Sequence, residues 1–434
     1  MLLALAAAGL LLPFTTRIEA SHPEALPVGE FVAGAVLVKF KPLIPSFMAD
    51  ATLSIQGLRM NGNVVGSEVR KAAVAPGEEL RAVAALRGNP LVDYAEPDYV
   101  LQTLWVPNDA YYSTAQWNLR QINVEKAWDI TRGSPGVKVA VIDTGLNMYN
   151  PDRPANIVSP RNQCTSGSEM GDSNNHGTHV SGIIAASANN GIGISGVAPD
   201  ISLMPVKVEC DGIITTSATT AAVHHAVDNG ARVMNISLGT ASFSQTMSDA
   251  IAYAVARGTL VVAAAGNGYS SGNLPMYPAA FPGVLAVGAS THEQTRASYS
   301  EVQPYVSVVA PGGDPSGGTD PDPNHWIKST YGTSYGSLAG TSQAAPHASG
   351  LAGLIWSVNP GLNSAQVADI ITSTASDLGP PGRDNEFGWG QVDAYPALLK
   401  AKGLSASPSP TPAVQRTSPS RIYVPLLPRD NSNW

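Results

Sequence analysis

Five short apolar runs along the middle of the chain constrain its fold more than any other feature of the sequence. They are rich in valine, isoleucine and alanine and lie at 137–142, 201–209, 231–238, 259–265 and 283–289. Nearly continuous apolar runs of this length are typical of strands that are buried on both faces of a parallel sheet. Parallel strands need long crossover connections, which are usually helices.

Helical patterns lie between these runs. The clearest spans 244–258 and ends at Gly258. Its apolar residues repeat at the spacing of one helical face; they are Met247, Ala250, Ile251, Ala254 and Val255. The alternation of strand and helix from about 120 to 400 therefore predicts an α/β fold with a doubly wound, mainly parallel sheet and helices on both faces.

A smaller pattern precedes this region. Residues 34–42 and 92–102 have the composition of strands, and 78–88 has the periodicity of a helix. A Pro-Asn-Asp turn at 107–109 follows. We therefore expect a small α+β unit in front of the main domain.

The two ends of the chain differ from the rest in composition. The apolar run Leu2–Leu12 is too short to span a bilayer and lies where the apolar part of a secretory signal belongs. No Lys or Arg precedes Arg17, so the basic start of such a signal is missing, and a buried N-terminal helix is the alternative. The Pro/Ser-rich segment 406–419 predicts an extended or disordered tail. The RIYVPLLP that follows is either a docking or sorting tag or unstructured chain.

The charge balance narrows the function. Charged residues make up 13%, and the net charge is −8 with no basic cluster. This argues against electrostatic binding to nucleic acid or to an anionic membrane surface. No apolar run after the first twenty residues is long enough to cross a membrane, so we expect no membrane span in the mature protein.

Polar residues stand where several of the predicted strands end. Asp143 ends the first run, Ser-Leu-Gly (237–239) follows the third, and Gly266 and Asn267 follow the fourth. Binding and catalytic sites of open α/β sheets form at this edge. We therefore look for the site among these residues.

Two further motifs, HGTH (176–179) and GTS (340–342), each open an apolar, Ala/Gly-rich helix. Acyl transfer by a serine needs a hydroxyl, an imidazole that accepts its proton, and a carboxylate that orients the imidazole. Ser342, His176 and Asp143 provide these three groups. Backbone N–H groups at the helix start and the Asn267 amide are candidate donors to the oxyanion that develops on the substrate.

Each motif alone has another interpretation. Asp-Thr-Gly is also the signature of aspartic proteases, which need a second copy that this chain lacks. His176 and His179 have the spacing of a metal-binding pair, but no third ligand stands at suitable helical spacing. The glycine before Ser342 is compatible with a simple tight turn.

Taken together, the motifs resemble the subtilase family of serine endopeptidases. The order Asp, His, Ser is that of the family, and VAVIDTG, HGTHVSG, NISLG, AAAGN and GTSQAAPHASG are similar to its motifs. The stretch PNDAYYSTAQW…AWDITRG is most similar to the thermitase branch. The resemblance covers about residues 105–400.

The resemblance implies a role for each of these positions. Asp143, His176 and Ser342 would form the catalytic triad, Asn267 would donate to the oxyanion, and His179 and His347 would be structural. A peptide substrate would add as an extra strand to an open edge; the residues implied in substrate binding are Ser237, Leu238, Gly239 and Gly266.

The resemblance implies no cofactor for the chemistry but a structural Ca²⁺. Asp152 and Asn190 stand at positions that help to hold calcium in relatives, joined by Asp109 and by main-chain carbonyl groups. The alternative is that these are ordinary turn residues.

The two cysteines, Cys164 and Cys210, are predicted to form a disulfide. They flank the same predicted catalytic helix in a chain that we expect to be exported, and oxidising compartments favour disulfides.

We therefore predict a secreted, monomeric serine endopeptidase of broad specificity that acts on polypeptide substrates. The predicted parts are a signal peptide at 1–20, a propeptide at 21–104, the peptidase domain at 105–401 and a tail at 402–434. The propeptide would be an intramolecular inhibitor that the zymogen removes itself. The alternatives are a selective processing protease and a catalytically silent binding protein with the same fold.

Overall fold

The computed structural model describes residues 31–100, 105–314 and 325–403. The chain divides into two compact units, 1–103 and 104–434, and each is described by itself. The segments predicted as a signal peptide (1–20) and as a tail (402–434, apart from its first two residues) lie outside the described residues. Within the described residues, we find no helix that is both long and apolar enough to cross a membrane.

The N-terminal unit is a four-stranded antiparallel sheet with two helices. The strand order is β2-β3-β1-β4. Its elements are β1 (Phe31–Phe40), α1 (Ser46–Ile55), β2 (Arg59–Asn63), β3 (Arg70–Ala73), α2 (Glu79–Arg87) and β4 (Val92–Tyr99). The three elements predicted from sequence correspond to β1, α2 and β4, whereas α1, β2 and β3 were not predicted. The apolar side chains of β1 and of both helices form its core.

The C-terminal unit is built on one large sheet. Its strands are β5 (Lys138–Asp143), β6 (Asn156–Ile157), β7 (Arg161–Asn162), β8 (Ser202–Lys207), β11 (Val233–Ile236), β12 (Leu260–Ala264), β13 (Val284–Ser290) and β14 (Val306–Pro311). They run in the order β14-β13-β12-β11-β5-β8-β6, with β7 also beside β8, and all neighbours pair in parallel. The predicted doubly wound, mainly parallel sheet is confirmed.

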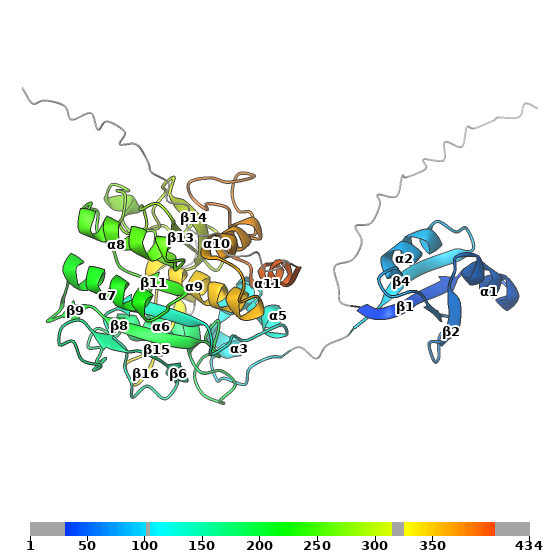
Figure 1. Ribbon diagram of the computed structural model, residues 1–434, viewed down its shortest axis with the longest axis horizontal. Helices are drawn as coiled ribbons and strands as arrows, with labels where there is room; N and C mark the ends of the chain where they lie inside the picture. Colours follow the sequence, from blue (N-terminus) through cyan, green and yellow to red (C-terminus); the bar gives the residue numbers. More distant parts are fainter. Residues whose placement is uncertain (1–30, 101–104, 315–324, 404–434) are drawn as a thin grey trace, which may run out of the picture. The chain divides into compact units, whose positions relative to one another are not determined.

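Helices cover both faces of this sheet. α7 (Thr216–Asp228) and α8 (Gln245–Ala256) pack on one face; α6 (His176–Ala185) and α9 (Thr341–Val358) pack on the other, with α10 (Ser364–Ser373) and α11 (Ala394–Gly403) against α9. Figure 1 shows α7 and α8 on one side of β11, and α9, α10 and α11 on the other.

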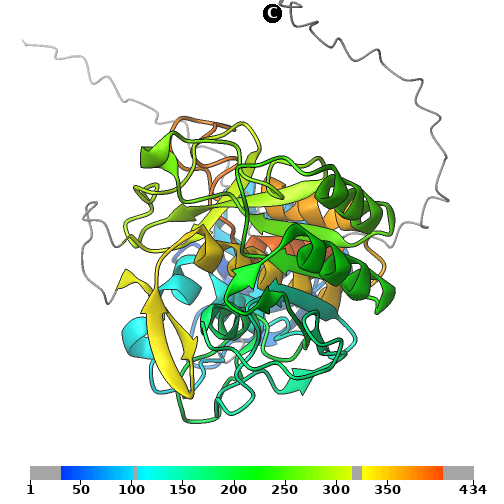
Figure 2. The same ribbon diagram turned by 90° about the vertical axis from the view of Figure 1, so that its left-hand side faces the viewer.

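Smaller elements complete the C-terminal unit. They are α3 (Tyr112–Ala115), α4 (Trp117–Gln121), α5 (Val124–Trp128), β9 (Glu209–Cys210), β10 (Ile213–Ile214), the 3-10 turn η1 (Tyr269–Ser271), β15 (Ile327–Tyr331) and β16 (Ser334–Leu338). β15 and β16 form an antiparallel hairpin, drawn in yellow in Figure 2. This hairpin packs on α6.

The core explains why the strands are apolar throughout. In β5, Val139 and Val141 point to the α9 side, whereas Ala140 and Ile142 point to the α7 and α8 side. Successive side chains of a strand alternate between faces, so a strand covered by helices on both faces needs apolar residues at every position.

The order of the strands determines where a site can form. From β5 the chain first builds the sheet outward through β8 on one side, and then returns to build it through β11 on the other. The edge at the carboxyl end of β5 and β11 is therefore the switch point of the sheet, where open α/β sheets bind their ligands.

Candidate active site

Asp143 and His176 meet at this switch point. Asp143 is the last residue of β5, and His176 is the first residue of α6. The Nδ1 atom of His176 lies 2.7 Å from Oδ1 of Asp143. The carboxylate is 1% exposed, while the imidazole side chain is 25% exposed and so faces both the carboxylate and solvent.

Opposing effects set the pKa of His176. Burial lowers it, but the charge of Asp143 and the hydrogen bond to it raise it, and the more distant charges of Asp172 and Glu209 add to this. The net pKa lies above the ordinary value of the imidazole. This environment stabilises the protonated ring that forms when a histidine accepts a proton from a nucleophile.

Asp172 fixes the start of α6, a contribution that the sequence did not reveal. Its Oδ2 accepts from the backbone N–H and the hydroxyl of Thr178, at 2.8 and 2.6 Å. Its Oδ1 accepts from the hydroxyl of Thr144 at 2.8 Å, next to Asp143. This one buried carboxylate therefore joins the end of β5 to the first turn of α6, and so it fixes the positions of Asp143 and His176 relative to each other.

Ser342 lies in the first turn of α9, and α9 packs against α6. Its hydroxyl donates to the carbonyl oxygen of Ser237 at 2.9 Å, and the Ser237 hydroxyl donates to the carbonyl oxygen of Ser342 at the same distance. The serine is thus held against the residue that follows β11. Hydrogen bonds of catalytic groups are often poorly aligned before substrate binds.

Asn267 stands two residues beyond Ala265, in the loop that follows β12, and it is exposed. Its Oδ1 accepts from both the backbone N–H and the hydroxyl of Thr341, at 2.9 and 2.8 Å. With the oxygen engaged, the Nδ2 group is directed toward Gly340, where an added Cβ would lie 3.3 Å from it. The amide N–H groups are therefore presented beside the start of α9.

Two side chains that the sequence did not single out flank Gly266. A Cβ at this position would lie 2.5 Å from Cγ of Met276 and 2.7 Å from Cγ of Glu301. The φ of +119° also requires glycine here. Glu301 is 1% exposed and lies in a stretch that reads as an ordinary polar loop, so no local signal could have identified it.

The predicted substrate-binding edge follows β11. Leu238 is half-buried, and Gly239 approaches Tyr277 so closely that a Cβ would lie 2.7 Å from its carbonyl oxygen. Thr240 and Tyr277 exchange two backbone hydrogen bonds of 2.9 and 2.8 Å, which hold this segment. Met276 also spans from Gly266 to within 3.6 Å of the Cβ position at Gly239. Met276 therefore lies between the two segments.

The other two histidines of the motifs are fully buried. Nε2 of His179 lies 3.0 Å from the carbonyl oxygen of Ile327, and burial lowers the pKa of His179 to about 3. His347 contacts Asn118 at 2.8 Å and the carbonyl oxygen of Gln343 at 2.9 Å, and burial lowers its pKa to about 4. Both rings are therefore neutral and hydrogen-bonded within the fold.

Asp109, Asp152 and Asn190 come together at the loop after α6. Asp109 accepts from the backbone N–H of Asn190 at 2.9 Å, and Asp152 accepts from its side-chain amide at 2.7 Å. Burial raises the pKa of Asp152 to about 6, and the charge of Asp109 acts in the same direction. Among the described residues, no group of three or more His, Cys, Asp or Glu side chains has the arrangement of a metal site.

Cys164 and Cys210 are joined in a disulfide, with their Cα atoms 5.5 Å apart. Cys164 lies in the segment between β7 and α6, and Cys210 ends β9. The bond therefore ties the chain that leads to His176 to the strand that follows β8.

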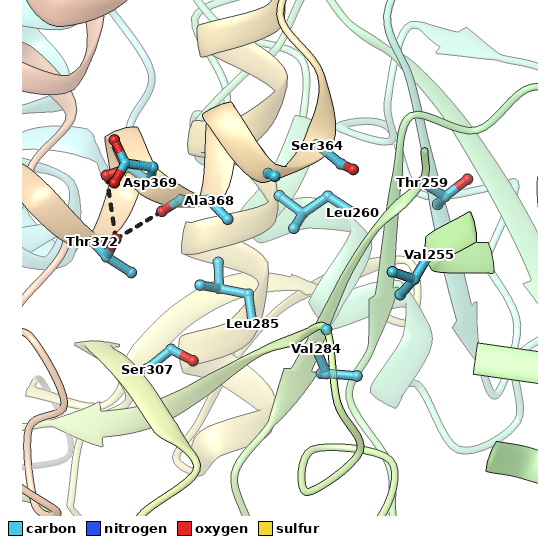
Figure 3. Close-up of a pocket in the computed structure, with 12 residues that line it drawn as sticks. Val255, Thr259, Leu260, Val284, Leu285, Ser307, Ser364, Ala368, Asp369 and Thr372 are labelled. Carbon is cyan, nitrogen blue, oxygen red and sulfur yellow. Dashed lines mark hydrogen bonds between the residues drawn. The ribbon is translucent and has the colours of Figure 1, made fainter. Parts of the chain in front are cut away.

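A separate cavity of about 350 Å³ lies away from these groups. It is lined by the C-terminal end of α8, the starts of β12 and β13, and one face of α10, with Leu260, Leu285 and Ala368 among its apolar residues (Figure 3). These strand starts are at the opposite edge of the sheet from Asp143. The cavity is therefore not part of the candidate active site.

Comparison with known proteins agrees with this geometry. Residues 134–390 match the subtilase family. The chain is 35% identical over 384 residues to a thermophilic serine proteinase of Bacillus sp., covering 88% of this chain and 90% of the relative. It is 36% identical over 296 residues to thermitase of Thermoactinomyces vulgaris, covering 68% of this chain and 99% of the relative.

Solved structures of proteases share the fold. A protease from Pseudoalteromonas arctica has a TM-score of 0.61 and 33% identity, covering 68% of this chain and all of the other. Fervidolysin from Fervidobacterium pennivorans, a keratinolytic enzyme related to subtilisin, has a TM-score of 0.60 and 26% identity, covering 86% of this chain and 62% of the other.

Proposed function

Because the chain belongs to the subtilase family and is a serine endopeptidase, we propose that Asp143, His176 and Ser342 are its catalytic triad. The observation that carries the proposal is the 2.7 Å contact between His176 and Asp143, in which a buried carboxylate raises the pKa of the imidazole. Ser342 lies in the first turn of the helix α9, which packs against the helix that begins at His176.

The reaction proceeds through an acyl-enzyme. The Ser342 hydroxyl turns from the Ser237 carbonyl toward His176, which accepts its proton as the oxygen attacks the scissile carbonyl carbon. His176 then donates this proton to the leaving amine. A water molecule attacks the acyl-enzyme by the same route and releases Ser342. Asp143 keeps the imidazole in the tautomer that accepts at Nε2 and stabilises its protonated form.

Asn267 and the start of α9 stabilise the oxyanion. The first backbone N–H groups of a helix have no partner within the helix, so the Ser342 N–H is available as a donor. The second donor is Nδ2 of Asn267, since its Oδ1 is engaged by Thr341. The developing negative charge also lies at the positive end of the α9 dipole.

The substrate adds as an extended strand along residues 237–239. Backbone hydrogen bonds to this edge hold the peptide with little dependence on its sequence, which supports broad specificity. The side chain before the scissile bond would lie against the residues implied in substrate binding, Leu238, Gly239 and Gly266, with Met276 beside them.

A structural Ca²⁺ fits the loop after α6. Two buried carboxylates lie close together, and their hydrogen-bond donors there are neutral N–H and O–H groups. Buried negative charge of this kind is stabilised by a cation, and carboxylate and carboxamide oxygens suit calcium. Asp109, Asp152 and Asn190 would hold it. The ion supplies no chemistry to catalysis and would stabilise the loop.

The remaining parts complete a secreted, monomeric zymogen. Residues 1–20 are the signal peptide, 21–104 a propeptide that inhibits the enzyme, 105–401 the peptidase domain, and 402–434 a tail. The two related proteases match this chain over 90% and 99% of their own lengths, and the disulfide fits an oxidising compartment.

A covalent probe tests the proposed triad. A fluorophosphonate should label the wild-type protein at Ser342, and Ser342→Ala should abolish labelling and lower kcat by about 10⁶, the effect of losing the nucleophile in subtilisin. The readouts are the mass of the labelled peptide and hydrolysis of a peptide p-nitroanilide. Near-normal turnover by purified Ser342→Ala protein would contradict the assignment and favour another nucleophile.

A further inference from the structure

Asn267 must be held in place from its backbone as well as from its side chain if its amide is to stabilise an oxyanion. Thr341 binds only the side-chain oxygen. The loop itself lies between the left-handed Gly266 and the turn η1, and glycine on both sides of Asn267 gives it little intrinsic rigidity. Another part of the fold therefore has to fix the two peptide groups that flank Asn267.

One residue contacts both of these peptide groups. The backbone N–H of Glu301 donates to the carbonyl oxygen of Gly266 at 3.2 Å. The Oε1 atom of Glu301 accepts from the backbone N–H of Gly268 at 3.0 Å. The residue thus brackets Asn267, with its main chain on one side and its side chain on the other.

Glu301 is itself anchored on the side away from Asn267. The next residue, Val302, exchanges two hydrogen bonds of 2.8 Å with the side chain of Asn273. Gln303 donates to the carbonyl oxygen of Asn273. The segment 301–303 is therefore joined to the far end of the loop, and a change in the length of the Glu301 side chain cannot be absorbed by a shift of its backbone.

The chemistry of the contact needs an acceptor rather than a charge. Glu301 is 1% exposed, and its Oε2 has no hydrogen-bond partner among the described residues. Burial raises the pKa of this carboxyl, which disfavours the charged form. The carbonyl-like Oε1 is a good acceptor in either protonation state. A side chain of the same length with an amide oxygen should do the same.

We propose that Glu301 is a positioning residue for catalysis, which clamps the peptide groups on both sides of Asn267 so that its amide points at the oxyanion. The inference rests on the proposed role of Asn267. Since a displacement of about 1 Å at a catalytic group can cost about 10²-fold in rate, loosening this clamp should lower kcat and leave KM nearly unchanged, because the donor acts on the transition state.

The test compares Glu301→Gln with Glu301→Asp after the N-terminal unit has been removed. Because a slow variant would process itself poorly, a trace of tagged wild-type enzyme is added to make this cut and is then removed. The kinetics of an apolar peptide p-nitroanilide are measured for each. Glu301→Gln keeps the length and the acceptor, so its kcat should stay within about threefold of wild type. Glu301→Asp keeps the charge but is one methylene short, so its kcat should fall about tenfold or more.

A double-mutant cycle with Asn267→Ala separates positioning from general damage. Asn267→Ala alone should lower kcat by about 10²–10³. In that background, adding Glu301→Asp should change kcat by less than about twofold, since the group that Glu301 positions is gone. The control is Arg383→Ala, which removes hydrogen bonds to the carbonyl oxygens of Pro304 and Val306, away from Asn267 and from the clamp; it should lower thermal stability without lowering kcat.

The outcomes distinguish the inference from the function on which it rests. An unchanged kcat in Asn267→Ala would contradict the proposed role of Asn267. If Asn267→Ala lowers kcat as expected but the effect of Glu301→Asp on kcat is fully additive, the clamp is overturned and the role of Asn267 stands. The same conclusion follows if Glu301→Gln is as slow as Glu301→Asp. If Glu301→Asp does not fold, Glu301→Met replaces it, because it keeps the buried volume but its sulfur is only a weak hydrogen-bond acceptor; the same loss of kcat is expected.

Discussion

At the scale of single residues, the pair His176–Asp143 predicts the pH dependence of the enzyme. In the proposed mechanism the neutral imidazole is the base, so activity should be lost as the pH falls and His176 becomes protonated. Its pKa is raised above the ordinary 6.5, with Asp143 as the main cause that acts in this direction. The acid limb of kcat/KM, which reports the free enzyme, should therefore have its midpoint above 6.5.

The variant that tests this is Asp143→Asn, which keeps the shape of the carboxylate and removes its charge. The midpoint should move to lower pH, because burial then acts without the opposing charge, and kcat should fall by about 10⁴. The rate of fluorophosphonate labelling against pH gives the midpoint even at low turnover. A midpoint that is the same in both proteins would mean that another group controls the acid limb.

A second prediction concerns Gln343, which follows the proposed nucleophile; the resemblance to the subtilase family implies a methionine at this position. Gln343 is 2% exposed, and its Oε1 lies 2.9 Å from the Cβ position of Gly340, beside the oxyanion donors. A methionine sulfoxide there would obstruct the site, whereas glutamine has no sulfur to oxidise. We expect the wild type to keep most of its activity in dilute peroxide and Gln343→Met to lose it.

The structure adds one control to this experiment. None of the nine methionines neighbours a proposed catalytic residue in sequence, but Met276 lies against Gly266, next to Asn267. Any slow loss of activity in the wild type should therefore disappear in Met276→Leu. Equal rates of inactivation for the wild type and Gln343→Met would show that the sensitive residue lies elsewhere.

At the scale of elements, the loop that follows α6 predicts the effect of calcium. If Asp109 and Asp152 hold the ion, removing it leaves two buried carboxylates facing each other, and the unit should unfold at a lower temperature. At a calcium concentration of 100 times Kd the ion adds about 2.7 kcal/mol. For a unit of this size that corresponds to a loss of roughly 5 °C in Tm on chelation.

The measurement uses Ser342→Ala protein, which cannot digest itself, with and without a chelator. Adding Asp152→Asn to this background should abolish the response to calcium. The matched control is Asp249→Asn on the exposed face of α8, which should respond as the parent does. A Tm that the chelator does not change would contradict the calcium proposal and leave these residues as turn formers.

The elements also show how far the sequence could be interpreted. The strands were predictable because burial on two faces leaves a continuous apolar run, and α8 because burial on one face leaves a helical period. Ser244 caps the start of α8, since its hydroxyl accepts from the backbone N–H of Met247. The strand β2 was not predictable, since all of its residues are exposed.

The same contrast holds in the site. Asp143, His176 and Asn267 belong to motifs at strand and helix ends, so the order of elements was enough to bring them to one edge of the sheet. Asp172 and Glu301 lie in loops. They matter to the site because each makes a hydrogen bond to a residue that is distant in the sequence. A polar residue in a loop carries no local sign of such a contact.

At the scale of the whole molecule, the boundary between the two units bears on maturation. Trp105 already belongs to the C-terminal unit. Its backbone N–H donates to Oδ1 of Asp129 at 2.8 Å. Its ring centroid lies 5.0 Å from that of Trp128 and 4.9 Å from Cζ of Arg132. The residues just before it, 101–104, lie outside the described residues. A cut before Trp105 would therefore separate the units and leave every one of these contacts intact.

We predict that the enzyme makes this cut itself, within 102–106. When each protein is expressed alone, the wild type should lose its N-terminal unit, and Ser342→Ala should keep it, because the same serine would perform the cleavage. His176→Ala should also stay uncut, while Glu293→Gln, at an exposed residue, should mature normally. Intact mass and N-terminal sequencing give the new end of the chain, which we expect before Trp105 because the anchored residues are not free to enter the cleft. Cleavage of Ser342→Ala at this position would show that another protease matures the chain, and a new end beyond Trp105 would show that its contacts open before the cut.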